Sequence, residues 1–188
     1  MRLLIYGSKD FALTVADLIR HCGHEVIGMV DDFNSGPGIL GGLESIVKDF
    51  PPDECSFAVA IGYSNLPMRW KACDKVRAAG YGTPTLVHPR AYVADTARLG
   101  NGCLVMAGAI VDVRAKLGDH VVIWPGTCVN HDVTVGANTF ISPGSTICGF
   151  ANVGANSFLG AATVIADHCH VPESSFLKMQ TRYTSGQD

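Results

Sequence analysis

Residues 99–135 read LGNGCLVMAGAIVDVRAKLGDHVVIWPGTCVNHDVTV, and every sixth residue of this stretch, counted from Leu99, is aliphatic. The same period extends in both directions, at Val93, Leu99, Val105, Val111, Leu117, Ile123, Val129, Val135, Ile141, Ile147, Val153, Leu159, Ile165 and Val171. A helix and a strand both have shorter periods. A solenoid with three short strands per coil fits, because each face then takes about six residues and each coil about eighteen.

A second set of positions supports the same winding. Four residues after each of the first thirteen aliphatic positions lies a small or β-branched side chain, at Ala97, Cys103, Ala109, Ala115, Val121, Thr127, Val133, Thr139, Ser145, Ala151, Ser157, Thr163 and Cys169. Gly100, Gly118, Gly136 and Gly154 are spaced by eighteen residues. We expect these glycines to stack on one corner, where a turn can use positive φ.

The residues before the repeat alternate between short apolar runs and helical patterns. We expect strands at 2–6, 25–30, 56–61 and 85–87, helices at 10–22 and 65–79 with a shorter one at 43–50, and a loop at 34–42. The fold class is therefore a small Rossmann-like β-α-β domain, residues 1–84, followed by a parallel β-helix, residues 85–172. Residues 173–188 are expected to form a tail that leaves the six-residue register.

The composition narrows the class of protein. The chain has 188 residues, is 47% hydrophobic and 16% charged, and carries a net charge of −3, which disfavours binding to nucleic acid or a membrane surface. It shows no signal peptide and no 18-residue apolar stretch, which points to the cytoplasm. The seven cysteines include no CxxC pair, and Cys103 and Cys169 fall on inward positions, as expected for reduced core residues.

One pair of residues breaks the repeat in a chemically useful way. His131 and Asp132 occupy an outward corner position, where an imidazole beside a carboxylate can act as a general base. Gly149 lies eighteen residues further on, so its N–H should sit about one strand spacing (roughly 4.8 Å) from His131, where it can stabilise an oxyanion. The alternative is a surface histidine in a polar turn.

The other histidines give weaker signals. His88 precedes a proline at the domain junction and is expected to be structural, and His120 is expected to be a solvated corner side chain. His168 and His170 raise the possibility of zinc, together with His131. Their spacing matches no convergent set of three or four ligands, so no metal is expected.

The loops that follow the first three strands suggest a ligand site in the first domain. They contain Gly7, Ser8, Lys9, Asp10, Phe11, Asp31, Asp32 and Gly62. These loops lie at the carboxyl ends of parallel strands, where α/β domains bind ligands. The G-x-G-x-x-G pattern is absent, which favours a nucleotide without a redox role. The alternative is a domain that serves only assembly.

Together these features resemble a known family. A small β-α-β domain followed by hexapeptide coils, with the His88-Pro89 junction and the motif Asn130-His131-Asp132, is similar to the sugar acyltransferases related to NeuD and PglD. The resemblance covers residues 1 to about 172. It implies a left-handed β-helix and a homotrimer with active sites between subunits. It also implies acetyl transfer from acetyl-CoA to an amino sugar, usually nucleotide-linked, or to a sialic acid hydroxyl.

The resemblance also assigns roles by position. His131 matches the family's base, Asp132 its acidic partner, and Gly149 the glycine whose amide meets the thioester oxygen. The nucleotide-sugar pocket corresponds to Gly7–Phe11, Asp31, Asp32 and Gly62, and acetyl-CoA binding to Phe140, Gly149 and Ala161. Phe140 stands where relatives carry a second histidine, and Lys9, Asp10 and Phe11 replace a loop richer in glycine.

The expected function is N-acetylation of a nucleotide-linked amino sugar, such as a 4-amino-4,6-dideoxy hexose, for surface glycans such as lipopolysaccharide. Three alternatives remain from the sequence: a sialic acid O-acetyltransferase, a non-catalytic sugar-nucleotide-binding or assembly protein, and a zinc hydratase of the carbonic anhydrase type.

Overall fold

The computed structural model describes residues 1–184, which divide into two compact units that meet between Leu86 and Val87. The first unit contains a four-stranded parallel sheet with the order β3-β2-β1-β4. Its strands are β1 (Arg2–Tyr6), β2 (Glu25–Val30), β3 (Ile39–Gly41) and β4 (Ser56–Val59). The central strand β1 is almost entirely buried, as its continuous apolar run predicts.

The helices of this unit follow their sequence signals. They are α1 (Asp10–His21), α2 (Leu43–Ile46) and α3 (Leu66–Ala78), with a 3-10 turn at Tyr63–Asn65. Asn65 caps α3, because its side chain accepts a hydrogen bond from the Met68 N–H at 3.0 Å. Strand β3 lies inside the segment expected to be a loop; its two apolar residues between glycines are too few to show a strand period.

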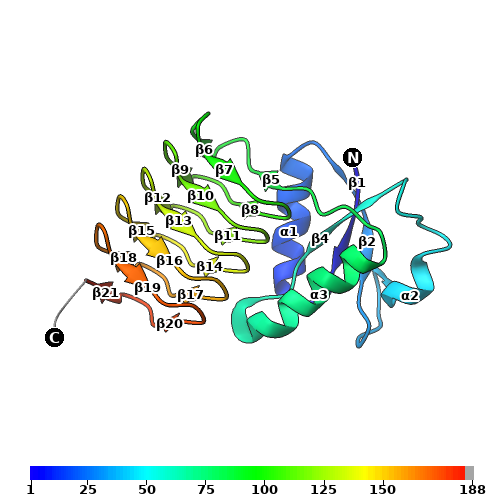
Figure 1. The fold of residues 1–188 in the computed structure, drawn as a ribbon. Coiled ribbons are helices and arrows are strands. Elements are labelled where there is room, and N and C mark those ends of the chain that lie inside the picture. Colours follow the sequence, from blue (N-terminus) through cyan, green and yellow to red (C-terminus); the bar gives the residue numbers. More distant parts are fainter. Residues whose placement is uncertain (185–188) are drawn as a thin grey trace. The chain divides into compact units, whose positions relative to one another are not determined.

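The second unit is a parallel β-solenoid of about five coils, and its strands stack coil upon coil (Figure 1). We name its three sheets after their first strands. The β5 sheet contains β5 (Leu86–Val87), β8 (Leu104–Val105), β11 (Val122–Ile123), β14 (Phe140–Ile141), β17 (Phe158–Leu159) and β20 (Phe176–Leu177). The β6 sheet contains β6 (Tyr92–Val93), β9 (Ile110–Val111), β12 (Cys128–Val129), β15 (Thr146–Ile147), β18 (Val164–Ile165) and β21 (Arg182–Tyr183). The β7 sheet contains β7 (Arg98–Leu99), β10 (Lys116–Leu117), β13 (Thr134–Val135), β16 (Asn152–Val153) and β19 (His170–Val171).

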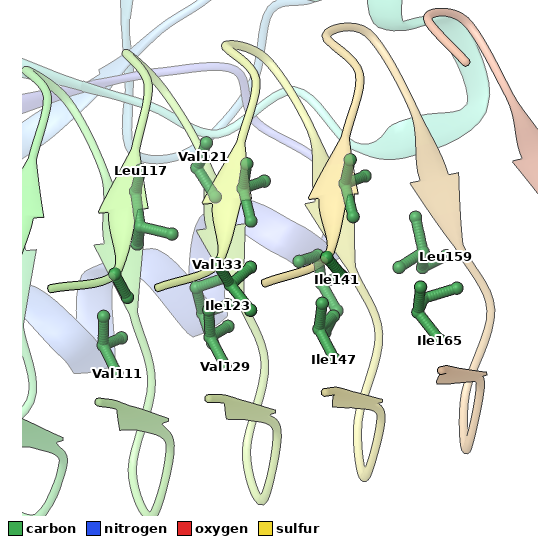
Figure 2. Packing of buried hydrophobic residues seen from close by; sticks show 14 of the residues in the cluster. Val111, Leu117, Val121, Ile123, Val129, Val133, Ile141, Ile147, Leu159 and Ile165 are labelled. Carbon is green, nitrogen blue, oxygen red and sulfur yellow. The ribbon is translucent and has the colours of Figure 1, made fainter. Parts of the chain in front are cut away.

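The six-residue period builds the core of the solenoid. The aliphatic side chains from Val105 to Val171 are buried in the core, and Figure 2 shows those labelled from Val111 to Ile165 packed inside the coils. Each contributes roughly 1.5–3 kcal/mol by leaving water. Polar residues can occupy the small inward positions because their hydroxyls donate hydrogen bonds to backbone carbonyls at the corners. The Thr127 hydroxyl, for example, donates to the Ser142 carbonyl at 3.0 Å. Cys103 and Cys169 are buried in the core, as expected, and no disulfide joins any of the seven cysteines, which all lie within residues 1–184.

The expected role of the stacked glycines is wrong in one respect. Gly100, Gly118, Gly136 and Gly154 do share one corner, but none of them has positive φ. A Cβ on Gly118 would lie 2.6 Å from the Ala137 nitrogen of the next coil, so glycine is required there for close approach of the backbones. The left-handed residues come two positions later, and they need not be glycine: His120 and Asn138 have φ of 58° and 57°.

Two further expectations are corrected. The register does not end at Val171: Leu177 and Tyr183 continue the six-residue period in β20 and β21, which pair with β17 and β18. The sequence signal was missed because the last inward position, Tyr183, is aromatic and the residues around it after Met179 are polar. His120 is not solvated but buried, because its ring lies over Gly102, where any side chain would collide with it. His88 accepts the Arg90 N–H at 3.0 Å within its turn.

No helix among residues 1–184 has the length and apolar character needed to cross a membrane.

Candidate functional site

The first unit holds a cavity of about 560 Å³ at the carboxyl ends of β1, β2 and β4. All the residues predicted for substrate binding line it: Gly7, Ser8, Lys9, Asp10, Phe11, Asp31, Asp32 and Gly62. Gly7 is required at the end of β1, because its φ is +114° and a Cβ would lie 2.8 Å from the Ala60 carbonyl oxygen. The three loops therefore converge as the parallel sheet predicts.

Asp31 organises the rim of this cavity. Its carboxylate accepts hydrogen bonds from the Ser8 hydroxyl at 2.6 Å, from the backbone N–H groups of Phe33 and Asn34, and from the Asn34 amide. Burial alone would raise the pKa of Asp31, but these donors lower the pKa below its ordinary value. Both carboxylate oxygens of Asp31 accept hydrogen bonds from the protein itself. Asp31 therefore fixes the conformation of the loop after β2, in addition to any contact with a ligand.

Asp32, the next residue along the chain, is held in a similar way. It accepts from the Tyr6 hydroxyl at 2.5 Å, from the Leu43 N–H at 2.8 Å, and from the Lys75 ammonium. Burial opposes ionisation, yet these donors lower the pKa of Asp32. Burial and the neighbouring carboxylate raise the pKa of Tyr6 well above its ordinary value, so the phenol keeps its proton.

Helix α3 also contributes to this cavity, which was not predicted from the sequence. Met68, Lys71, Ala72 and Lys75 line it, at the i, i+3, i+4, i+7 spacing of one helix face. That spacing was visible in the sequence, but it reads as an ordinary helix without the position of the sheet. Lys9, Lys71 and Lys75 line the cavity together with Asp10, Asp31 and Asp32. Lys75 is paired with Asp32, so Lys9 and Lys71 are the cations left to meet an anionic ligand.

In the second unit, the coil spacing brings His131 and Gly149 together, as predicted. A Cβ built on Gly149 would lie 2.6 Å from Cε1 and 2.8 Å from Nε2 of His131, so the imidazole ring lies directly against this glycine. The Phe150 N–H donates to the His131 carbonyl at 3.2 Å and fixes the two coils in register. Within residues 1–184 the Gly149 N–H donates no hydrogen bond, so it is available to a ligand.

Asp132 orients the His131 ring. Nδ1 of His131 is 3.0 Å from Oδ2 of Asp132. Because a carboxylate can only accept, Nδ1 carries the proton, and Nε2 of the neutral ring keeps its lone pair. This is the tautomer that a general base requires.

Arg114, one coil earlier, was not predicted and completes this group. Its Nε and Nη2 each donate to one oxygen of Asp132 at 2.7 Å, a bidentate pair. Arg114 first and His131 second lower the pKa of Asp132 to about 2. The sequence signal was the eighteen-residue spacing from Arg114 to Asp132, which puts the two residues on adjacent coils.

Aromatic contacts limit how far the imidazole can turn. Phe150 meets the His131 ring edge to face, with centroids 5.2 Å apart, and stacks on His168 at 4.8 Å. His168 is thus part of a ring stack. Among residues 1–184 no three His, Cys, Asp or Glu side chains are grouped so that they could hold a metal ion.

The residues assigned to acetyl-CoA do not meet on one chain. Gly149 lies with His131 at the corner between the β6 and β7 sheets, whereas Ala161 follows β17 at the corner between the β5 and β6 sheets. Phe140 lies on the β5 sheet, buried, with its ring 5.9 Å from Trp124 and 6.1 Å from Phe158. The contacts of Phe140 and Ala161 with acetyl-CoA stay a prediction.

Comparison with known proteins agrees with this two-part arrangement. Residues 2–76 match the model of the PglD N-terminal domain, and residues 114–149 match that of the bacterial transferase hexapeptide (six repeats). No curated protein sequence matches the chain.

Solved structures are similar over nearly the whole chain. One is the acetyltransferase domain of PglB from Neisseria gonorrhoeae FA1090 in complex with acetyl coenzyme A, at 25% identity and a TM-score of 0.85, covering 98% of this chain and 93% of that one. Another is PerB from Caulobacter crescentus in complex with CoA and GDP-perosamine, at 26% identity and a TM-score of 0.87, covering 99% and 92%. A mutant of perosamine N-acetyltransferase from the same organism matches at 26% identity and a TM-score of 0.75, covering 95% and 93%.

The repeat, the two domain matches and these neighbours define the chain as an acyltransferase of the hexapeptide-repeat class. Within that class it is similar to the PglD- and NeuD-like sugar acetyltransferases, which confirms the resemblance seen in the sequence.

Proposed function

We propose that this protein transfers an acetyl group from acetyl-CoA to the amino group of a nucleotide-linked amino sugar, such as a 4-amino-4,6-dideoxy hexose. The observation that carries the proposal is the placement of His131 against Gly149, with Nδ1 held by Asp132 and Nε2 left as an acceptor. The similarity to PerB in complex with CoA and GDP-perosamine supports this class of acceptor.

In the proposed reaction, Nε2 of His131 accepts a proton from the sugar amine as the amine attacks the thioester carbonyl. Asp132 stabilises the imidazolium that forms, and the free N–H of Gly149 donates to the developing oxyanion. The carbon–sulfur bond then breaks, and the imidazolium returns the proton to the leaving thiolate. The amine is itself the nucleophile, so none of the cysteines is needed as one.

The cavity of the first unit is proposed to hold the nucleotide part of the acceptor. Lys9 and Lys71 supply positive charge there, and the loop after β1 offers backbone N–H groups to a phosphate. Asp31 and Asp32 fix the loop that shapes the cavity.

We further propose that the active enzyme is a homotrimer with sites between subunits. Two features support this. The residues assigned to acetyl-CoA, Gly149, Phe140 and Ala161, lie on separate faces of one chain. The outward side of the β6 sheet exposes the apolar side chains of Tyr92, Ile110 and Val164, as expected of a surface that a second subunit covers. Because the reaction would consume acetyl-CoA and a nucleotide sugar, we place it in the cytoplasm, in the synthesis of surface glycans.

The test is turnover by His131→Ala, with His24→Ala as control because His24 lies in the first unit outside the cavity. Loss of a general base lowers kcat roughly 10²–10⁴-fold, and thermal unfolding should be unchanged because the His131 side chain is 45% exposed. Turnover of His131→Ala close to wild type would refute the assignment. A sialic acid belongs in the substrate panel, since its acetylation would favour the O-acetyltransferase alternative.

A further inference from the structure

A hollow of about 260 Å³ lies on the solenoid beside Asp132, the carboxylate that orients His131. It is lined by Thr96, Arg98, Arg114, Lys116, Asp132 and Thr134. Three of its six side chains are cationic and only one is acidic. We call this the basic groove.

The charges of the basic groove are not balanced within the protein. Asp132 is already committed to Arg114 and to His131. The side chains of Arg98 and Lys116 make no ion pair or hydrogen bond within residues 1–184. The groove therefore presents two uncompensated cations.

The winding of the solenoid places these two cations side by side. Arg98 and Lys116 are directly paired residues of the parallel strands β7 and β10, and neighbouring strands lie about 4.8 Å apart. Like charges in this position repel one another and destabilise the sheet. A bound anion bridging the two side chains would remove that repulsion.

We propose that the basic groove binds a phosphate or diphosphate group through Arg98 and Lys116. Arginine and lysine are the side chains best suited to phosphate oxygens, and the hydroxyls of Thr96 and Thr134 line the same hollow. The groove shares Asp132 with the proposed catalytic group, so the anion would be bound one to two coils before His131. The inference rests on the proposed function in one respect: both proposed substrates, the nucleotide sugar and acetyl-CoA, carry such a group.

The direct test uses inorganic pyrophosphate and the full chain. Pyrophosphate should raise the Tm of the wild type at low ionic strength, because a ligand that binds only the folded state stabilises it. The double variant Arg98→Gln/Lys116→Gln should lose that rise. The control Lys178→Gln/Arg182→Gln removes the same charge from exposed positions outside the groove and should keep it. A wild type that pyrophosphate does not stabilise, or a double variant stabilised as much as the wild type, would overturn the proposal.

Calorimetry then separates the two sources of phosphate. If the groove binds the phosphates of the acetyl donor, the double variant should bind CoA at least about tenfold more weakly than the wild type, with its affinity for a nucleoside diphosphate unchanged. If the groove binds the diphosphate of the acceptor sugar, the affinity for the nucleoside diphosphate should fall by that factor and the affinity for CoA should stay unchanged. Equal affinity of variant and wild type for both ligands counts against the groove. These readouts do not depend on turnover, so a failure of the groove leaves acetylation through His131 standing, and a failure of acetylation leaves the pyrophosphate result standing.

Discussion

Replacing Gly149 by alanine would test the stacking of His131 on the next coil. The new Cβ would lie 2.6 Å from Cε1 of the imidazole, whereas ordinary contact begins near 3.4 Å, so the ring must move by about 0.8 Å. Gly149 does not have positive φ, so alanine puts no strain on the backbone. Alanine also keeps the N–H, so the change displaces the base without deleting the oxyanion donor.

The ring cannot make this movement without losing its geometry. Asp132 holds Nδ1 at 3.0 Å, and Phe150 packs edge to face at 5.2 Å. A misplacement of about 1 Å can cost roughly a hundredfold in rate, which corresponds to about 2.7 kcal/mol of transition-state stabilisation. We therefore expect kcat/KM of Gly149→Ala to fall about a hundredfold while the Tm stays close to that of the wild type.

The assay is release of CoA thiol with a nucleotide-linked amino sugar as acceptor. Gly82→Ala is the matched control, because its Cβ would meet only the Ser56 side chain, at 3.3 Å, and a serine hydroxyl can rotate away. Activity of Gly149→Ala within about twofold of wild type would show that the contact of the ring with this glycine is not needed for the reaction.

Three further predictions follow from the described contacts. Gly118→Ala should lower the free energy of unfolding by about 1–3 kcal/mol in urea titrations, because the Cβ would lie 2.6 Å from a backbone nitrogen; unchanged stability would contradict the close approach of coils. Asp132→Asn should be less stable than wild type at neutral pH. The pKa of Asp132 is lowered to about 2, so its contribution is fully present above the unfolded value of about 3.9 and is lost as the pH falls toward 2; the stability difference should shrink over that range, and a constant difference would argue against the ion pair. Asp31→Ala should raise the KM for the nucleotide sugar about tenfold with little change in kcat, since it loses the bonds that order the rim; an unchanged KM would show that the rim does not bind the acceptor.

The solenoid could be predicted from the sequence because its period is strict and each inward position demands an apolar side chain. The strict period also predicts which residue lies beside His131. Eighteen residues make one coil, so Gly149 lies next to His131 on the following coil. Arg114 follows the same rule, but an arginine at an exposed corner has no distinguishing feature until its partner is seen.

The errors have physical causes. Gly118 and its equivalents were assigned to positive φ because glycine permits it, whereas the structure needs them for backbone contact. His120 was expected in water because histidine is polar, but the empty space above Gly102 accommodates its ring. The final coil was missed because Tyr183 fills an inward position normally held by an aliphatic residue.

The most direct measurement is a crystal structure of the protein with CoA and a nucleotide-linked amino sugar. We expect the sugar amine within about 2.6–3.2 Å of Nε2 of His131, with the CoA sulfur beside the Gly149 N–H. An amine bound at another corner of the solenoid, with the imidazole left open to solvent, would contradict it.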